Sequence, residues 1–244
     1  MIADVYTVLW KEIKELFFQR GRFRAGMTGM LFFTAVFGIF LPLQTGKSWV
    51  ESPIGLIYWS WVPFLLVSSV IADSFAGERE RHTLETLLAC RLPDLAILTG
   101  KLAASILYGW GSTMACILLG LITLNIAYGD GHLLLYPWKI MLGITVLSFL
   151  VASLAAGLGV LVSLRSATVR QAQQTFSIAF FVLFIPMFLL PMLPDGWKSK
   201  FIQVFSHTNL ETIVVLIVGA LLVIDGLLFL LAAARFQRDK LILE

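Results

Sequence analysis

The chain has 244 residues, of which 59% are hydrophobic and only 14% are charged, and its formal net charge is +3. A soluble domain usually carries about 25% charged residues, so water is the wrong solvent for most of this surface. The composition therefore excludes an ordinary soluble globular domain and predicts a membrane protein.

The first expected element is an amphipathic helix within residues 1–24. Val5, Leu9 and Ile13 recur at helical spacing, so one face of this helix is apolar. The opposite face carries Thr7, Lys11, Lys14 and Glu15. A helix of this kind lies in the membrane interface rather than crossing it. We expect that position, with a helix packed on a partner as the alternative; its charges also leave no apolar core for a cleavable signal peptide.

Six transmembrane helices follow from the distribution of charge. Five charge-free runs, and a sixth interrupted only by Asp225, each have the roughly 20 residues that a helix needs to cross about 30 Å of hydrocarbon. We expect the spans at about 25–46, 52–73, 102–126, 139–164, 171–193 and 211–234. The predicted fold is an all-α membrane protein with residues 1–244 forming a single transmembrane domain.

Particular residues refine these spans. Trp59 lies near the start of the second span and is expected in an aromatic belt at the lipid–water boundary. Pro93 and Asp94 fit the first turn of the helix that becomes the third span. Gly157 and Gly159 belong to a run of small residues in the fourth span, which predicts close helix contact.

The basic residues predict the orientation of the chain. Of its 18 lysines and arginines, all but four fall on the same side of the membrane as the N-terminus. The four exceptions are Lys47, Lys139, Lys198 and Lys200. The positive-inside rule then places both termini in the cytoplasm. We expect a multi-pass protein of the cytoplasmic (inner) membrane.

Two further features allow two interpretations each. Residues 195–210 are short and partly apolar, so they form either a re-entrant segment or a surface loop. Asp225 lies inside the sixth span, where an ionisable residue costs at least about 2.5–3.5 kcal/mol unless it is shielded. It is either an intramembrane polar site for a cation or proton, or a protonated or hydrogen-bonded residue at a helix interface; the second is favoured because no span offers a basic partner.

Motifs for catalysis are missing from the sequence. It contains no HExxH, CxxC or GxSxG pattern and no paired acidic motif. A GxxxxGK[ST] phosphate loop is also missing, so we expect no ATP hydrolysis by this route in this chain. We therefore expect no catalytic residue, metal site or bound cofactor, and no nucleic-acid partner.

The strongest signal is a charged segment between the second and third spans. Leu84, Leu87 and Leu88 share one helical face and would form an apolar tip. The charged rim around this tip would consist of Glu78, Arg79, Glu80, Arg81 and Glu85. An apolar core with a charged rim is typical of a protein interface, whereas exposed ion pairs alone contribute only about 0–1 kcal/mol. This pattern predicts a docking surface for a soluble partner.

The same segment resembles the signature region of the ABC-2 type transporter permeases, in which a Gly-Glu-Arg/Lys-Glu-Arg-x-Thr-Leu-Glu run precedes a Leu-rich turn and a Gly-Lys. The residues that fit are Gly77, Glu78, Arg79, Glu80, Arg81, Thr83, Leu84, Glu85, Leu87, Leu88, Gly100 and Lys101. His82 stands where the family commonly has glycine, and Arg91 where it commonly has proline. The stretches KEIKELFFQRGRFR and GLGVLVSLRSATVRQAQQ are also similar to parts of the family, so the resemblance covers essentially the whole chain.

The resemblance implies a permease subunit that is not itself an enzyme. Such a subunit works as a homo- or heterodimer with two cytoplasmic ATPase subunits. ATP and Mg²⁺ would bind to those ATPases, and residues 78–88 would be the coupling helix that docks on them, with Arg165 and Arg170 as a minor second contact. Export is the expected direction, surrounding lipid is an expected partner, and the substrate is unspecified. The alternatives are a self-contained ion-coupled transporter or channel that uses Asp225, or a membrane scaffold.

Overall fold

The computed structural model describes residues 1–18, 31–51, 54–83, 90–129, 132–189 and 210–236, and every element within these ranges is helical. Four of these helical runs are long and apolar enough to cross a membrane: Trp59–Glu80, Asp94–Tyr128, Trp138–Ser163 and Thr212–Arg235. They correspond to four of the predicted spans. The all-helical membrane class is confirmed. The count of six stays a prediction, because the first and fifth expected spans, at 25–46 and 171–193, extend beyond the described ranges.

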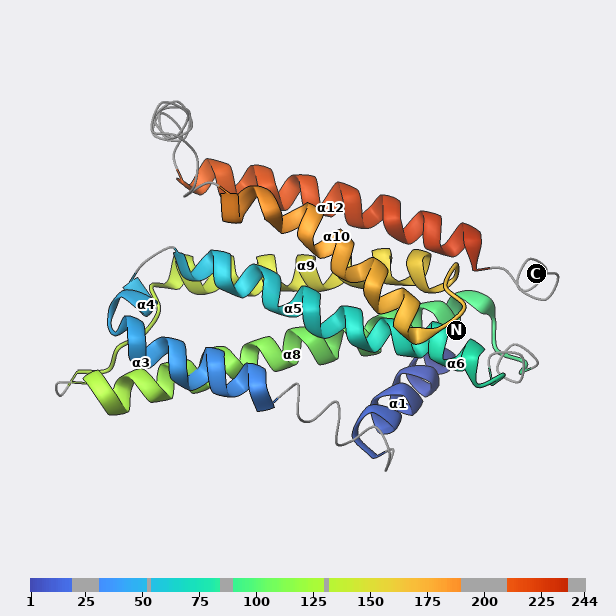
Figure 1. Cartoon of the computed structure of the whole chain (residues 1–244), viewed down its shortest axis with the longest axis horizontal. Helices are drawn as coiled ribbons and strands as arrows, with labels where there is room; N and C mark the ends of the chain where they lie inside the picture. The colour runs from blue at the N-terminus through green and yellow to red at the C-terminus, as the bar shows by residue number, and fades with distance from the viewer. Residues whose placement is uncertain (19–30, 52–53, 84–89, 130–131, 190–209, 237–244) are drawn as a thin grey trace.

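Three long helices pack against one another at the centre of the bundle: α5 (Ile54–Ala72), α8 (Asp94–Tyr128) and α9 (Trp138–Ser163). Two more cover them, with α12 (Leu210–Arg235) on α9 and α10 (Val169–Leu189) on α5 and α9. A shorter apolar helix, Leu31–Thr45, includes the π-helical turn η1 (Val36–Phe40) and α3 (Leu41–Thr45), and it packs on α8. The short α4 (Ser48–Glu51) lies at one end of the bundle (Figure 1).

The N-terminal helix α1 (Ile2–Phe18) lies at the other end, against α8 and close to the short α6 (Glu78–Glu80) (Figure 1). We call this the α1 end of the bundle. The predicted N-terminal helix is thereby confirmed as an element, and it packs on the chain's own bundle. Its expected position at a lipid surface stays a prediction.

Small side chains bring α5 and α9 into close contact, as expected from the small-residue run. A Cβ atom added at Gly159 would lie 2.1 Å from Cγ2 of Ile71, which is far inside van der Waals contact. Ala155 and Ala156 are fully buried in the same interface. Glycine is therefore required at residue 159 for the two helix backbones to approach this closely.

Trp59 departs from its expected position. It is 0% exposed, and its ring centroid lies 5.9 Å from those of both Trp49 and Phe37. The expectation of a lipid-facing belt position is wrong for this residue, because its ring packs with other aromatic rings in the interior. Aromatic pairs at such distances add about 0.5–1.5 kcal/mol beyond the area that they bury.

The helix of the second span continues beyond its predicted end at residue 73. After α5, the chain forms the π-helical turn η2 (Asp73–Gly77) and then α6, without leaving the helical path. The reason is burial, because Ser74, Phe75 and Ala76 are all enclosed by neighbouring helices. The helix that becomes the third span begins as predicted, since α8 starts at Asp94 directly after Pro93.

Candidate functional site

The α1 end carries the candidate site, and it depends first on a close approach of α1 to α8. A Cβ atom added at Gly100 would lie 2.7 Å from Cβ of Val8 and 3.1 Å from the carbonyl oxygen of Val5. Val8 is itself buried. Glycine at residue 100 therefore lets the two helices touch through their backbones, and the next residue, Lys101, enters the interface between them.

Lys101 is 0% exposed and links three separate elements. Its Nζ atom lies 2.8 Å from Oε1 of Glu12 on α1 and 2.8 Å from Oε1 of Glu78 on α6. It also donates to the carbonyl oxygen of Ser74 at 2.9 Å, while the Ser74 hydroxyl donates to Oε2 of Glu12 at 2.9 Å. The ammonium group sits 5.3 Å from the ring centroid of Phe75, within range of a cation–π interaction.

The half-exposed side chain of Lys11 contacts the same carboxylates from the outer side of the network. Its Nζ atom lies 3.0 Å from Oε1 of Glu78, 3.3 Å from Oε1 of Glu15 and 3.4 Å from Oε1 of Glu12. We call these five residues, Lys11, Glu12, Glu15, Glu78 and Lys101, the α1 cluster. Because removing one partner of a buried ion pair typically costs 3–5 kcal/mol, the cluster holds α1 firmly to the segment around residue 78 and to α8.

The surroundings of Glu12 and Lys11 in the α1 cluster shift the pKa of each residue toward its ionised form. Burial alone would raise the pKa of Glu12, but the ion pairs with Lys101 and Lys11 and the hydrogen bond from Ser74 outweigh it, so the net pKa is below its ordinary value. Burial alone would lower the pKa of Lys11, and the surrounding carboxylates of Glu12, Glu78 and Glu15 raise it above its ordinary value instead. Both shifts favour the charged forms of Glu12 and Lys11.

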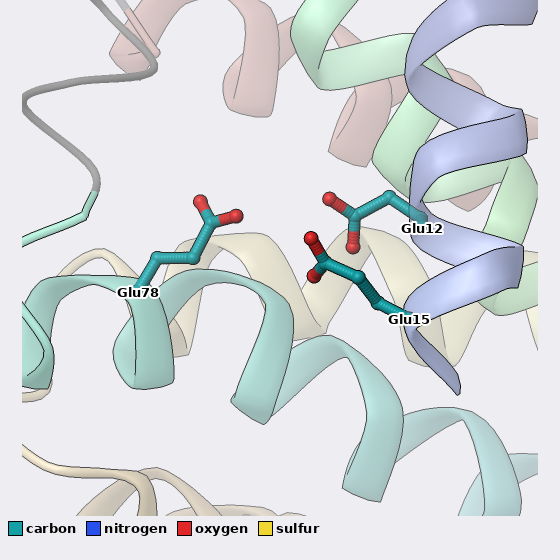
Figure 2. A group of neighbouring side chains, drawn as sticks. All are labelled: Glu12, Glu15 and Glu78. Carbon is teal, nitrogen blue, oxygen red and sulfur yellow. The ribbon is translucent and has the colours of Figure 1, made fainter. Parts of the chain in front are cut away.

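Figure 2 shows the three carboxylates of the cluster turned toward one another, two from α1 and one from α6. Their oxygen atoms lie within 4.8 Å of one another, a spacing that would suit a metal ion. The ammonium groups of Lys101 and Lys11 are bound between these oxygens, however, at 2.8–3.4 Å. Two ammonium groups therefore already balance most of the negative charge of the three carboxylates, and the ion pairs join helices.

The segment after Glu78 ends its helix in a defined way. Thr83 N–H donates to the carbonyl of Glu78 at 2.9 Å, and His82 N–H donates to that of Arg79 at 3.0 Å. These two bonds form a Schellman motif, whose C′ residue takes a left-handed conformation and is usually glycine. His82 occupies that position with φ of 56°. This geometry explains physically why glycine suits the position at which this chain has histidine.

A second turn lies beside this segment. The Glu80 carboxylate accepts a hydrogen bond at 3.2 Å from the backbone N–H of Val169, the first residue of α10. Arg165 and Arg170 flank this turn, and both are exposed. The structure therefore places the described start of the charged segment, at Glu80, beside the second turn that the sequence singled out.

The predicted site residues fall into three groups. Glu80 and Arg81 are exposed and Arg79 is partly exposed, as a charged rim requires. Glu78 was expected in this rim, but it is 4% exposed and belongs to the α1 cluster, because Lys101 and Lys11 draw its carboxylate inward. The remaining predicted residues, Leu84, Glu85, Leu87 and Leu88, lie outside the described residues.

Sequence reasoning missed Glu12. The helical pattern assigned Lys11 and Glu15 to a polar face but gave no role to Glu12, which is 4% exposed and faces the bundle. The available signal was its spacing, since Glu12 follows Val8 by four residues and so shares its face of α1. An acidic residue at such a position predicts a buried basic partner, which is Lys101.

The fold and the site together define a class: a helical membrane protein with exposed charged residues, among them Glu80 and Arg81, at one end of the bundle. Residues 45–234 match the model of a known family, the ABC-2 family transporter proteins. The chain belongs to this family and is an ABC-2 type permease, a membrane transport protein.

The chain is also similar to the ABC transporter permease protein NatB of Bacillus subtilis (strain 168). The two are 26% identical over 210 residues, which is 75% of this chain and 53% of NatB. The chain therefore spans about half the length of this curated relative.

Proposed function

We propose that the chain is the transmembrane subunit of an ABC exporter, driven by ATP hydrolysis in separate ATPase subunits. The ATPases dock on residues 78–88, which act as the coupling helix, and they bind ATP and Mg²⁺ themselves. A second permease subunit, identical or different, completes the transport path. The permease lies in the cytoplasmic membrane with both termini and the α1 end in the cytoplasm, as the distribution of basic residues favours.

The observation that carries this proposal is the set of ion pairs in the α1 cluster, which connect the coupling segment to α1 and α8. Glu78 is the first residue of this segment and Lys101 follows the segment on α8, and the two side chains are joined at 2.8 Å. A force applied to the segment by a docked partner therefore reaches α8 through Lys101 and α1 through Glu12. Rigid, buried connections of this kind favour movement of the helices as one body between discrete packings.

The exposed surface at the α1 end supports docking of a soluble partner. Glu80 and Arg81 present charges of both signs, and Arg165 and Arg170 add basic groups beside them. Charged side chains around an apolar centre form the usual rim of a protein interface. In this arrangement Leu84, Leu87 and Leu88 supply the apolar centre, with Glu85 in the rim.

The docking surface is tested with Leu87→Asp, which puts a charge in the apolar centre. Central interface residues are worth about 2 kcal/mol or more, so the affinity for the ATPase should fall roughly 30-fold or more. The measurement is the amount of ATPase that co-purifies with the permease, together with its ATP turnover in proteoliposomes.

Leu133→Asp is the matched control. Leu133 is 81% exposed and lies in the connection between the end of α8 and the start of α9, far along the chain from residues 78–88. This variant should retain the ATPase at the wild-type ratio. An intact, active complex formed by Leu87→Asp would show that the ATPase does not dock on this segment.

A further inference from the structure

A cavity of about 210 Å³ lies between α8, α9 and α12, apart from the docking surface. It is lined by Thr99, Leu102, Ala103, Ile106, Ser153, Gly157, Asp225 and Phe229. With a rise of 1.5 Å per residue, the place of Asp225 on α12 puts it about 15 Å from the end of that helix at Arg235. Asp225 is therefore at the expected depth of the hydrocarbon, and Thr99 lies just before the expected start of the third span.

The carboxylate of Asp225 is the unusual feature of this cavity. Both of its oxygen atoms are buried, and neither has a hydrogen-bond partner among the residues that the structure describes. The Ser153 hydroxyl is its polar neighbour in the cavity, but it does not meet hydrogen-bond geometry. Among the described residues, those that line the cavity include no lysine or arginine. A carboxylate in such surroundings is costly unless a ligand supplies the missing donor and charge.

The other walls indicate what kind of ligand fits. Leu102, Ile106 and Phe229 are apolar, and the Thr99 hydroxyl already donates to the carbonyl of Leu95 at 2.6 Å. A bare metal ion would need several oxygen ligands, which this lining does not supply. One anionic group in an apolar cavity instead matches an organic cation, with its N–H groups on the carboxylate and its carbon chain on the walls.

We propose that the cavity binds a lipophilic primary ammonium compound through Asp225. If the chain transports as proposed above, such amines are a substrate class and this cavity is a substrate site. The volume is below the roughly 300–1,000 Å³ of drug-sized pockets, so the guest is small, such as a single alkyl chain with one ammonium group.

The test is equilibrium binding of radiolabelled n-octylammonium to the full-length chain in phosphatidylcholine nanodiscs, after subtraction of the uptake by empty nanodiscs. This lipid has no N–H group that competes for the carboxylate. Asp225→Asn should weaken binding about tenfold or more, because it removes a charged hydrogen bond. It should also fold, since it removes a charge from the membrane. Gly219→Ala, on the same helix with open space around it, should bind like the wild type.

A second variant, Ala103→Phe, fills the cavity without touching the carboxylate and should also abolish binding. n-Octanol, which is similar in shape but neutral, should not compete with n-octylammonium. Equal competition by n-octanol, unchanged binding by Asp225→Asn, or no saturable binding to the wild type would each overturn the proposal. Because no ATPase is present in this assay, such a result would leave the proposed permease function standing.

Discussion

Lys101→Met should release α1 from the bundle while leaving the transmembrane helices in place. Methionine keeps the length and the apolar body of the side chain but removes the ammonium group. The variant leaves the carboxylates of Glu12, Glu15 and Glu78 with a single cation, Lys11. Since Lys11 is exposed on one side, it cannot replace an ammonium group at the centre of the network.

The size of the effect follows from burial. Lys101 is 0% exposed, and the side chains of Glu12 and Glu78 are only 5% and 6% exposed, with both contacts at 2.8 Å. Removing one partner from a buried pair costs about 3–5 kcal/mol, because the remaining charge is left uncompensated. Since every 1.4 kcal/mol is tenfold, the opening equilibrium of α1 should rise by roughly a hundredfold or more.

Hydrogen exchange measured by mass spectrometry reports this opening directly, through peptides from Ile2–Phe18. Exchange in these peptides should accelerate in Lys101→Met, whereas peptides from α9 should change little. Lys14→Met is the matched control, because Lys14 is exposed on the same helix. Adding Glu12→Gln to Lys101→Met should recover part of the loss. Unchanged exchange of α1 in Lys101→Met would refute the role assigned to the α1 cluster.

Two further predictions concern the interface between α1 and α8. Gly100→Ala should also speed hydrogen exchange in α1, because the added Cβ would lie 2.7 Å from Cβ of Val8 and destabilise the contact by about 1–3 kcal/mol. Gly111→Ala is the control, because the space around Gly111 is open, and it should leave the exchange of α1 unchanged. Since the pKa of Glu12 is lowered in the folded state, its stabilisation is present above the ordinary value of 4.5 and is lost as pH falls through the folded-state value. The thermal unfolding midpoint should therefore drop at acidic pH, and this drop should be smaller in Glu12→Gln; equal acid sensitivity in both proteins would contradict it.

Much of the fold could be predicted from the sequence because hydrocarbon imposes simple rules. Length, apolarity and the missing charges located four spans that the structure contains, and Pro93 correctly marked the start of α8. Two predictions, the position of Trp59 and the end of the second span, were wrong because the same apolar residue types are buried in protein and in lipid. Trp59 reads as an interfacial aromatic residue, but aromatic neighbours distant in the sequence enclose it. The second span likewise continues to Glu80, because neighbouring helices shield its last turns.

The candidate site was predictable in place but not in its internal arrangement. Alternating charge correctly drew attention to the segment after Gly77, yet it could not separate Glu78, which turns inward, from Glu80, which stays exposed. That difference depends on Glu12 and Lys101, which lie 89 residues apart and meet only in the folded chain. Pairwise contacts at such separation leave no periodic signal in one sequence. The sequence indicates such a contact only through a single residue, such as an acidic Glu12 on the buried face of α1.

The central claim, that a separate ATPase drives this permease, is tested most directly by purifying the tagged full-length chain from its native membrane. Mass spectrometry of the purified complex should identify a co-purifying subunit with a GxxxxGK[ST] phosphate loop, in a fixed ratio to the permease. Transport by the reconstituted complex should require hydrolysable ATP. Purification of the chain without such a subunit, combined with ion-driven flux in its absence, would contradict the account.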